Sequence, residues 1–390
     1  MLRASVRQGK LLGCDQTHVN KNKCQQIRTQ TLTNRSIITS LQAIVHRTGM
    51  STSLLRTMAT SKPGQRLPIH LMLDFDGTIT NRDTMFAYGA IADARDVRLG
   101  RKPTGSETFK GFGTAWMDDY TTHEQNYSPK QQDRKDIREE IAWLTSLAKV
   151  ETASAARVEG SGFFRHVTKD DIQRASDSLL RNEQITFRNG WERLFSNFGP
   201  QQPGHSSDST QPGLHISINS VNWSETFIRA TMRNAAHRAN LDPEVSTVIE
   251  GMTITANDLE GLENPDGASG RINSDGSSST RTTDDKHRNL VSSYQKDMQN
   301  VYVGDSPTDL RCLLAAGLGI CVRNDPMSSS SKELADLLTR TGYEVRHVSS
   351  CNSWSDQCIK DGPGGLLWAN DFEEIANLLE RLQEGHVSAA

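Results

Sequence analysis

The chain has 390 residues, a formal net charge of −3, 35% apolar residues and a mean hydropathy of −0.58. This length allows one large domain or two of ordinary size, and the low apolar content indicates that part of the chain stays outside a compact core. The small net charge and the lack of a long apolar run argue against nucleic acid or a membrane as a partner.

The charge is distributed unevenly, because residues 1–66 carry eleven Lys and Arg and a single acid, Asp15. This leader is rich in Arg, Ser and Thr and lacks an apolar secretory core, a composition typical of a mitochondrial transit peptide. Two alternatives stay open: a disordered basic tail, or a natural start at Met50 or Met58. We expect an intracellular protein, either cytoplasmic or, if the leader is genuine, mitochondrial.

Ile69 and residues 71–73 form an apolar run that continues as Asp-Phe-Asp-Gly-Thr, so the carboxylates Asp74 and Asp76 follow it closely. A run this short, cut off by Gly77, fits a buried parallel strand better than a helix. The hydroxyl of Thr78 can satisfy backbone amides freed by the turn. Acids at the carboxyl end of such a strand lie where open α/β sheets bind ligands.

This segment resembles the first signature of the haloacid dehalogenase (HAD) superfamily of phosphohydrolases. The resemblance implies an α/β fold with a Rossmann-like parallel-sheet core. It also implies three further motifs, which must follow in order, each at the end of a strand.

The next segment, 83–199, is much longer than a simple βα crossover needs, and its apolar residues recur at helical spacing. A capping box beginning at Thr168 marks the start of one expected helix. A helical insertion here resembles the cap domain of the phosphoserine-phosphatase-like branch of the superfamily. We therefore expect a leader at 1–66, an α/β core at 67–82 and 200–385, and an all-helical cap at 83–199.

Residues 214–218 alternate between apolar and polar and predict a strand that closes at Ser220. The second HAD motif is a strand ending in Ser or Thr, whose hydroxyl donates to the phosphoryl group, and Ser220 fits that position. Ser217 lies in mid-strand and should point elsewhere. Related phosphatases often continue with Gly-Gly, whereas this chain has Val221-Asn222, so the resemblance transfers no particular substrate.

Residues 245–256 have a strand-like pattern, and 258–285 then consists largely of Gly, Ser, Asn and Asp, which predicts a disordered insertion in the core. A helical pattern resumes at Lys286. The third HAD motif is a Lys at the start of this helix, where a cation opposes the helix dipole and propensity does not explain it. Lys296 is a rival for this role.

A short strand at 301–303 leads into Gly-Asp-Ser-Pro-Thr-Asp. Ser306 and Asp309 can close a capping box, which explains Asp309 without catalysis. No local structural task explains Asp305. The segment resembles the fourth HAD motif, GDxxxD, which implies that Asp305 binds a metal ion while Asp309 supports the site.

Together these motifs meet the demands of phosphoryl transfer, which needs charge neutralisation and a nucleophile held in line. The resemblance implies that Asp74 attacks phosphorus to form an aspartyl-phosphate, and that Asp76 protonates the leaving oxygen and then deprotonates water. Mg²⁺ is the expected cofactor, held by the carboxylates of Asp74 and Asp305 and the backbone carbonyl of Asp76. Lys286 and Ser220 would hold the phosphoryl oxygens, with Asp309 and Thr78 in support.

The expected function is a Mg²⁺-dependent phosphatase that hydrolyses a small phosphomonoester, so the expected partner is a small phosphorylated metabolite. A phosphotransferase or mutase would use the same residues. A non-catalytic phosphate-binding regulatory protein is a second alternative, although it would not need the acid at Asp76. A dehalogenase needs neither that acid nor a metal.

Overall fold

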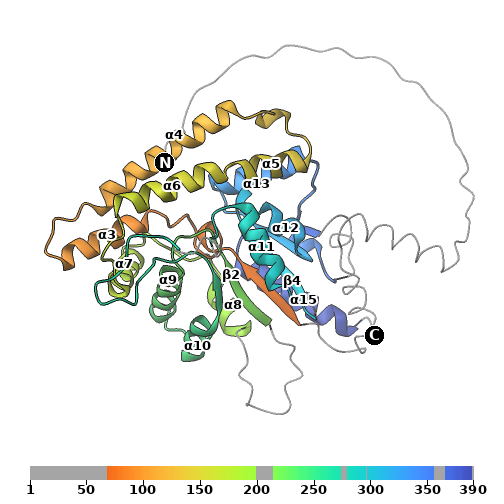
Figure 1. The fold of residues 1–390 in the computed structure, drawn as a ribbon. Coiled ribbons are helices and arrows are strands. Elements are labelled where there is room, and N and C mark those ends of the chain that lie inside the picture. Colours follow the sequence, from red (N-terminus) through yellow and green to blue (C-terminus); the bar gives the residue numbers. More distant parts are fainter. Residues whose placement is uncertain (1–67, 199–213, 274–278, 296, 355–364, 389–390) are drawn as a thin grey trace, which may run out of the picture. The chain divides into compact units, whose positions relative to one another are not determined.

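The computed structural model describes residues 68–198, 214–273, 279–295, 297–354 and 365–388 (Figure 1). Within them, seven parallel strands form one sheet in the order β3-β2-β1-β4-β5-β7-β6. The strands are β1 (Ile69–Leu73), β2 (Leu214–Asn219), β3 (Thr253–Thr255), β4 (Gln299–Gly304), β5 (Leu318–Val322), β6 (Arg346–His347) and β7 (Gly365–Ala369). The expected α/β class with a Rossmann-like parallel-sheet core is confirmed.

Strand β1 lies inside the sheet, between β2 and β4, and is buried on both faces. Leu71 and Leu73 join an apolar cluster on one face, and Met72 joins a cluster on the other. The first cluster includes residues of α8 (Trp191–Phe198), α9 (Glu225–Arg238), α10 (Pro243–Gly251) and α15 (Phe372–Ser388). The second includes residues of α11 (Thr283–Ser293), α12 (Leu310–Ala315) and α13 (Ser329–Arg340). Burial on both faces explains why apolar residues of β1 do not alternate with exposed polar ones; its one polar residue, His70, is buried too.

The described chain between β1 and β2 is mainly helical, as expected. It contains α3 (Ala87–Arg98), α4 (Gly105–Asn126), α5 (Ile137–Ser146), α6 (Ala148–Ser161) and α7 (Lys169–Arg181), followed by α8. The predicted capping box at Thr168 is present at the start of α7. Helix α4 packs along α6, and α3 packs against both α4 and α7 (Figure 1). Helix α7 also packs against α9, which joins the insertion to the core. The domain limits given above stay a prediction.

The strand expected at 245–256 is mostly a helix. Helix α10 occupies Pro243–Gly251, and β3 takes only Thr253–Thr255. The side chain of Asp242 accepts a hydrogen bond from the Glu244 N–H at 3.0 Å, and Pro243 stands at the first helical position. These are helix-start signals. Val245, Val248 and Ile249 lie on the buried side of this short helix.

The expectation of a disordered insertion at 258–285 is wrong for residues 258–273 and 279–285, which have a defined conformation; residues 274–278 lie outside the described part. Within this segment, Ala268 exchanges backbone hydrogen bonds with His166 and Val167, at 2.9 and 2.7 Å. Its few apolar residues are buried against the rest of the protein: Leu259, Leu262, Ala268 and Ile272. Tertiary contacts therefore order a sequence whose composition favours disorder.

No helix in the described part of the chain is both long enough and apolar enough to cross a membrane.

Candidate functional site

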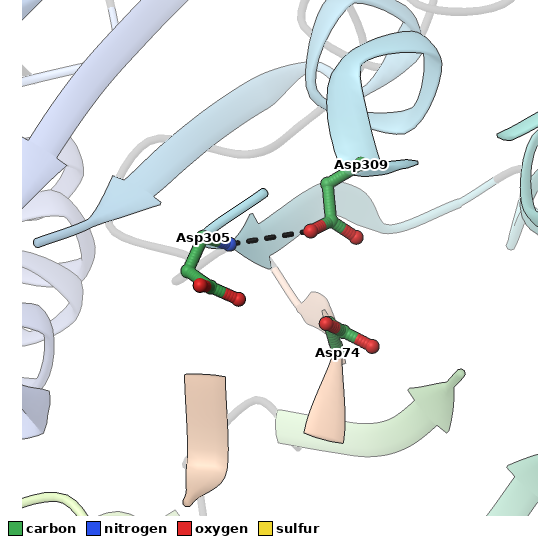
Figure 2. Close-up of side chains that lie close together, drawn as sticks. All are labelled: Asp74, Asp305 and Asp309. Carbon is green, nitrogen blue, oxygen red and sulfur yellow. Dashed lines mark hydrogen bonds between the residues drawn. The ribbon is translucent and has the colours of Figure 1, made fainter. Parts of the chain in front are cut away.

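Three buried carboxylates meet at the carboxyl edge of the sheet. Asp74 directly follows β1, Asp305 directly follows β4, and Asp309 ends the short turn that precedes α12. Because β1 and β4 pair in parallel, their carboxyl ends are neighbours. Carboxylate oxygens of the three residues lie within 4.8 Å of one another, and Figure 2 shows them facing a common space. The sequence prediction that these motifs converge is therefore confirmed for these three acids.

Lys286 lies between two of the acids. Its Nζ is 2.7 Å from Asp74 Oδ1 and 2.6 Å from Asp309 Oδ1, and its side chain is fully buried. Burial opposes the charge of Lys286, but the carboxylates of Asp309 and Asp74 raise its pKa above the ordinary value. The predicted lysine is thus placed at the acids by the first turn of α11. Its rival, Lys296, lies outside the described residues.

The acids repel one another despite this lysine. Burial, and then the charge of Asp309, raises the pKa of Asp74 well above its ordinary value, and Lys286 acts in the opposite direction. The same two causes raise the pKa of Asp305 to about 7. Three carboxylates facing one ammonium leave an excess of negative charge at the site.

Asp309 is saturated with hydrogen bonds. Its Oδ1 accepts from Lys286 Nζ and from the hydroxyl of Tyr302, at 2.6 and 2.7 Å. Its Oδ2 accepts from the backbone N–H groups of Asp305 and Ser306 and from the Ser306 hydroxyl, at 3.2, 3.1 and 3.0 Å. The predicted capping box is therefore present. Its engagement leaves Asp74 and Asp305 as the carboxylates more available to a ligand.

Asp74 and Asp305 have fewer partners within the described residues. Within them, the contact of Asp74 Oδ1 is the ion pair with Lys286 Nζ at 2.7 Å. Asp305 accepts from the hydroxyls of Thr78 and Ser330, at 3.2 and 2.7 Å. The Thr78 hydroxyl therefore supports Asp305 and not the freed amides; the Gly77 N–H donates instead to the Thr80 hydroxyl, at 3.2 Å.

The carboxylate of Asp76 is not part of this acid cluster. Its Oδ1 accepts hydrogen bonds from the backbone N–H of Thr84, at 2.9 Å, and from the Thr84 hydroxyl. Its Oδ2 accepts from Asn222 Nδ2 at 2.8 Å. The sequence reasoning missed both partners. The Val221-Asn222 departure from Gly-Gly was visible in the sequence, but its meaning required the fold.

Ser220 is buried just beyond β2, whose parallel pairing with β1 places it at the same edge as the acids. Its Oγ accepts from the backbone N–H of Asn222 at 3.1 Å, and within the described residues its own hydroxyl donates no hydrogen bond. That O–H remains available to an anionic ligand. Ser217 instead contacts His70 Nε2 at 2.8 Å, so it points elsewhere as expected.

A buried arginine, Arg188, holds the loop after β1 in place through hydrogen bonds. It was not among the residues predicted from the sequence. Arg188 donates from Nε to the Thr78 carbonyl at 2.8 Å and from Nη2 to the Gly77 carbonyl. Its Nη1 donates to the Asn370 carbonyl at 3.2 Å. Arg188 thus ties this loop to the end of β7. An isolated arginine after a helix gives no sequence signal for such a role.

A polar cleft of about 500 Å³ adjoins this loop. It is lined by Asn81, Arg82, Thr84, Glu183, Gln184, Ile185, Thr186, Arg188, Asn189, Asn324, Asp325, Asn370 and Asp371. Thr84 links the cleft to Asp76, because it both lines the cleft and donates to that carboxylate. Nearly all lining residues are polar, which suits a hydrophilic ligand.

No protein-family model matches the chain. Among curated proteins, a CTO1 family protein of Schizosaccharomyces pombe is 27% identical over 202 residues, which cover 49% of this chain and 62% of that protein. The match thus spans less than two thirds of the relative's length.

Solved structures that match the chain include a phosphoserine phosphatase with a phospho-aspartyl intermediate analogue, with 14% identity, a TM-score of 0.36, and coverage of 80% of this chain and 99% of that one. A phosphoserine phosphohydrolase-like protein from Francisella tularensis has 16% identity and a TM-score of 0.38, with the same coverage. A HAD family hydrolase from Salmonella enterica has 15% identity and a TM-score of 0.38, and the match covers 68% of this chain and 66% of that one.

Proposed function

We propose that this protein is a Mg²⁺-dependent phosphatase that hydrolyses a small phosphomonoester through a phosphorylated aspartate. The observation that carries the proposal is the cluster of Asp74, Asp305 and Asp309 around Lys286 at the carboxyl edge of a parallel sheet. Phosphoryl transfer needs this combination, because negative charge must be neutralised while a nucleophile is held in line.

The donor set fits a magnesium ion. Carboxylate oxygens are the ligands that Mg²⁺ prefers, and burial together with the charge of Asp309 raises the pKa of Asp74 and Asp305, an effect that a bound cation would oppose. Asp74 and Asp305 would hold the ion, together with the Asp76 carbonyl implied by the family resemblance. Bound there, Mg²⁺ would neutralise charge on the phosphoryl oxygens.

The protein's own residues divide the remaining tasks. Asp74 acts as the nucleophile, because it stands at the carboxyl end of β1 and its ion pair with Lys286 favours the ionised form of its carboxylate. Lys286 holds Asp74 and offsets phosphoryl charge, and the free O–H of Ser220 donates to a phosphoryl oxygen. Asp76 serves as the acid for the leaving oxygen and later as the base for water.

The leaving group would occupy the polar cleft beside Thr84. A volume of about 500 Å³ accommodates a small organic alcohol, and the polar walls favour one that carries hydroxyl or charged groups. The proposed substrate is therefore a small phosphorylated metabolite. A phosphotransferase would use the same residues and would differ only in passing the phosphoryl group to an acceptor alcohol.

The test is a panel of phosphorylated metabolites assayed with Mg²⁺ and with EDTA, with phosphate release and acceptor phosphorylation both measured. We expect phosphate release that requires Mg²⁺ and is absent in Asp74→Asn. Phosphorylation of added alcohols in place of phosphate release would identify a phosphotransferase. Tight phosphate binding without turnover of any ester would identify a binding protein and overturn the proposal.

A further inference from the structure

Asn222 is buried and makes a directed set of hydrogen bonds beside the proposed acid. Its Nδ2 donates to Asp76 Oδ2 at 2.8 Å. Its Oδ1 accepts from the hydroxyl of Tyr88 at 2.5 Å and from the backbone N–H of Ser224 at 3.2 Å. The side chain is thus held at both ends.

These partners define the orientation of the amide. Two donors, Tyr88 and Ser224, face one end of the Asn222 side chain, so its oxygen must lie there and its NH₂ must face Asp76. The reverse orientation would place the amide oxygen against the Asp76 carboxylate and the NH₂ group against the Ser224 N–H, which can only donate. Both changes are unfavourable in a buried site, because each leaves polar groups unpaired.

Tyr88 is itself fixed in position. It belongs to α3, in the helical segment between β1 and β2, and its ring is fully buried. The ring packs among other aromatic side chains, with centroid distances of 5.4 to 6.0 Å: Phe109, Phe164, Trp223 and Phe227. Such packing holds the hydroxyl in place at little further entropic cost. The insertion thereby contributes a fixed donor to the environment of the acid.

The two oxygens of Asp76 are held by different elements. The loop after β1 holds Oδ1 through Thr84, and the turn after β2 holds Oδ2 through Asn222. Loss of the second contact would leave the carboxylate free to rotate about the first. We propose that Asn222, oriented by Tyr88, is the positioning residue that aims Asp76 at the leaving oxygen.

This role rests on the proposed phosphatase function and concerns its first chemical step. In that step an oxygen of Asp74 bonds to phosphorus as the bond from phosphorus to the leaving oxygen breaks. The proton of Asp76 passes to the leaving oxygen, and Asp76 becomes ionised. Misplacing Asp76 slows this step most for a poor leaving group, because a good one departs without a proton.

The experiment compares two aryl esters of similar size, 4-nitrophenyl phosphate and phenyl phosphate, on wild type and variants at saturating Mg²⁺. Tyr88→Phe removes only the hydroxyl and keeps the packed ring. Tyr294→Phe is the matched control, because the hydroxyl of Tyr294 donates to the Ala315 carbonyl, also at 2.5 Å, and does not contact Asp76. Asn222→Ala removes the direct contact.

We expect Tyr88→Phe to lower kcat for phenyl phosphate by about 3- to 10-fold, the effect of one hydrogen bond, with a smaller loss for the nitrophenyl ester. Asn222→Ala should lose about 100-fold on phenyl phosphate, the lower end of what general acid catalysis contributes. Tyr294→Phe should have the same kcat as wild type on both esters. Equal losses on both esters in Tyr88→Phe and Asn222→Ala would overturn the positioning role.

A double-variant cycle separates this role from general damage to the fold. If Tyr88 acts through Asn222, adding Tyr88→Phe to Asn222→Ala does not further widen the difference in kcat between the two esters. Losses of kcat that multiply in the double variant would show that Tyr88 does not act through Asn222. If Asn222→Ala does not fold, the two-ester comparison in Tyr88→Phe still decides. A wild type that hydrolyses neither these esters nor any member of the metabolite panel would refute the phosphatase proposal itself, and this role with it.

Discussion

Replacing Asp305 with Asn should stabilise the metal-free protein at neutral and higher pH. Burial and the charge of Asp309 raise the pKa of Asp305 from 3.8 to about 7. Between these values the folded protein holds a proton that the unfolded chain has released. The free energy of unfolding therefore falls as pH rises through this range and stays low above it.

The size of the effect follows from the shift. A difference of 7 − 3.8, or 3.2 units, at about 1.4 kcal/mol per unit gives a penalty of about 4 kcal/mol above pH 7. Asn cannot ionise, so Asp305→Asn removes this penalty. Lost hydrogen bonds from Thr78 and Ser330 offset part of the gain. We expect the variant to gain about 1–3 kcal/mol relative to wild type at about pH 8, and no such gain near pH 4.

Urea unfolding in EDTA across this pH range measures the difference. Asp336→Asn, an exposed acid on α13, is the matched control and should show none. Adding Mg²⁺ should then stabilise wild type by mass action and leave Asp305→Asn unchanged. A stability difference that does not vary with pH would show that burial and neighbouring charges do not destabilise the ionised form of Asp305. Equal responses to Mg²⁺ in both proteins would show that Asp305 is not a metal ligand.

Three further outcomes are expected. Asp76→Asn should lose about 100-fold or more on phenyl phosphate and much less on 4-nitrophenyl phosphate, and equal losses would remove Asp76 as the leaving-group acid. Lys286→Met should destabilise the metal-free protein by about 3–5 kcal/mol in urea unfolding, because two buried carboxylates lose their cation; a change under 1 kcal/mol would show that the pair is not needed for folding. A fusion of residues 1–60 to a fluorescent protein should enter mitochondria, and a diffuse cytosolic signal would favour a start at Met50 or Met58.

The acid cluster could be predicted from the sequence because a parallel sheet brings strand ends together. Asp74 and Asp305 each stand immediately after an apolar run, and once both runs are strands of one parallel sheet their carboxylates share an edge. Asp309 followed from the local geometry of a capping box. Lys286 required the order of motifs, since a lone lysine at a helix start carries little information.

The partners of Asp76 could not be predicted in this way. Asn222 lies 146 residues from Asp76, to which it donates, and 134 residues from Tyr88, from which it accepts, and neither Asn222 nor Tyr88 lies in a sequence pattern typical of catalysis. Arg188 likewise acts through backbone carbonyls, which any residue supplies. Such contacts depend on how the helical insertion packs on the core, and one sequence does not specify that packing by periodicity.

The composition of 258–285 predicts disorder, but residues 258–273 and 279–285 have a defined conformation. Few apolar residues and many Gly, Ser and Asn predict disorder when a segment is considered alone. Here Gly261, Gly267 and Gly270 adopt positive φ and form tight turns, and the four apolar side chains are buried against neighbouring elements. For 245–256, the Asp242-Pro243 helix start was present in the sequence and outweighs the β-branched residues that follow it.

The most direct test of the proposed chemistry is to find the phosphoryl group on Asp74. Wild-type protein would be mixed with 4-nitrophenyl phosphate and Mg²⁺, quenched in acid within one turnover, digested, and analysed by mass spectrometry. We predict a phosphorylated peptide with the modification on Asp74, absent in EDTA and in an inactive Asp74→Asn variant. Turnover with no phosphorylation of Asp74, or an Asp74→Asn variant that keeps more than a few per cent of wild-type kcat, would contradict the account.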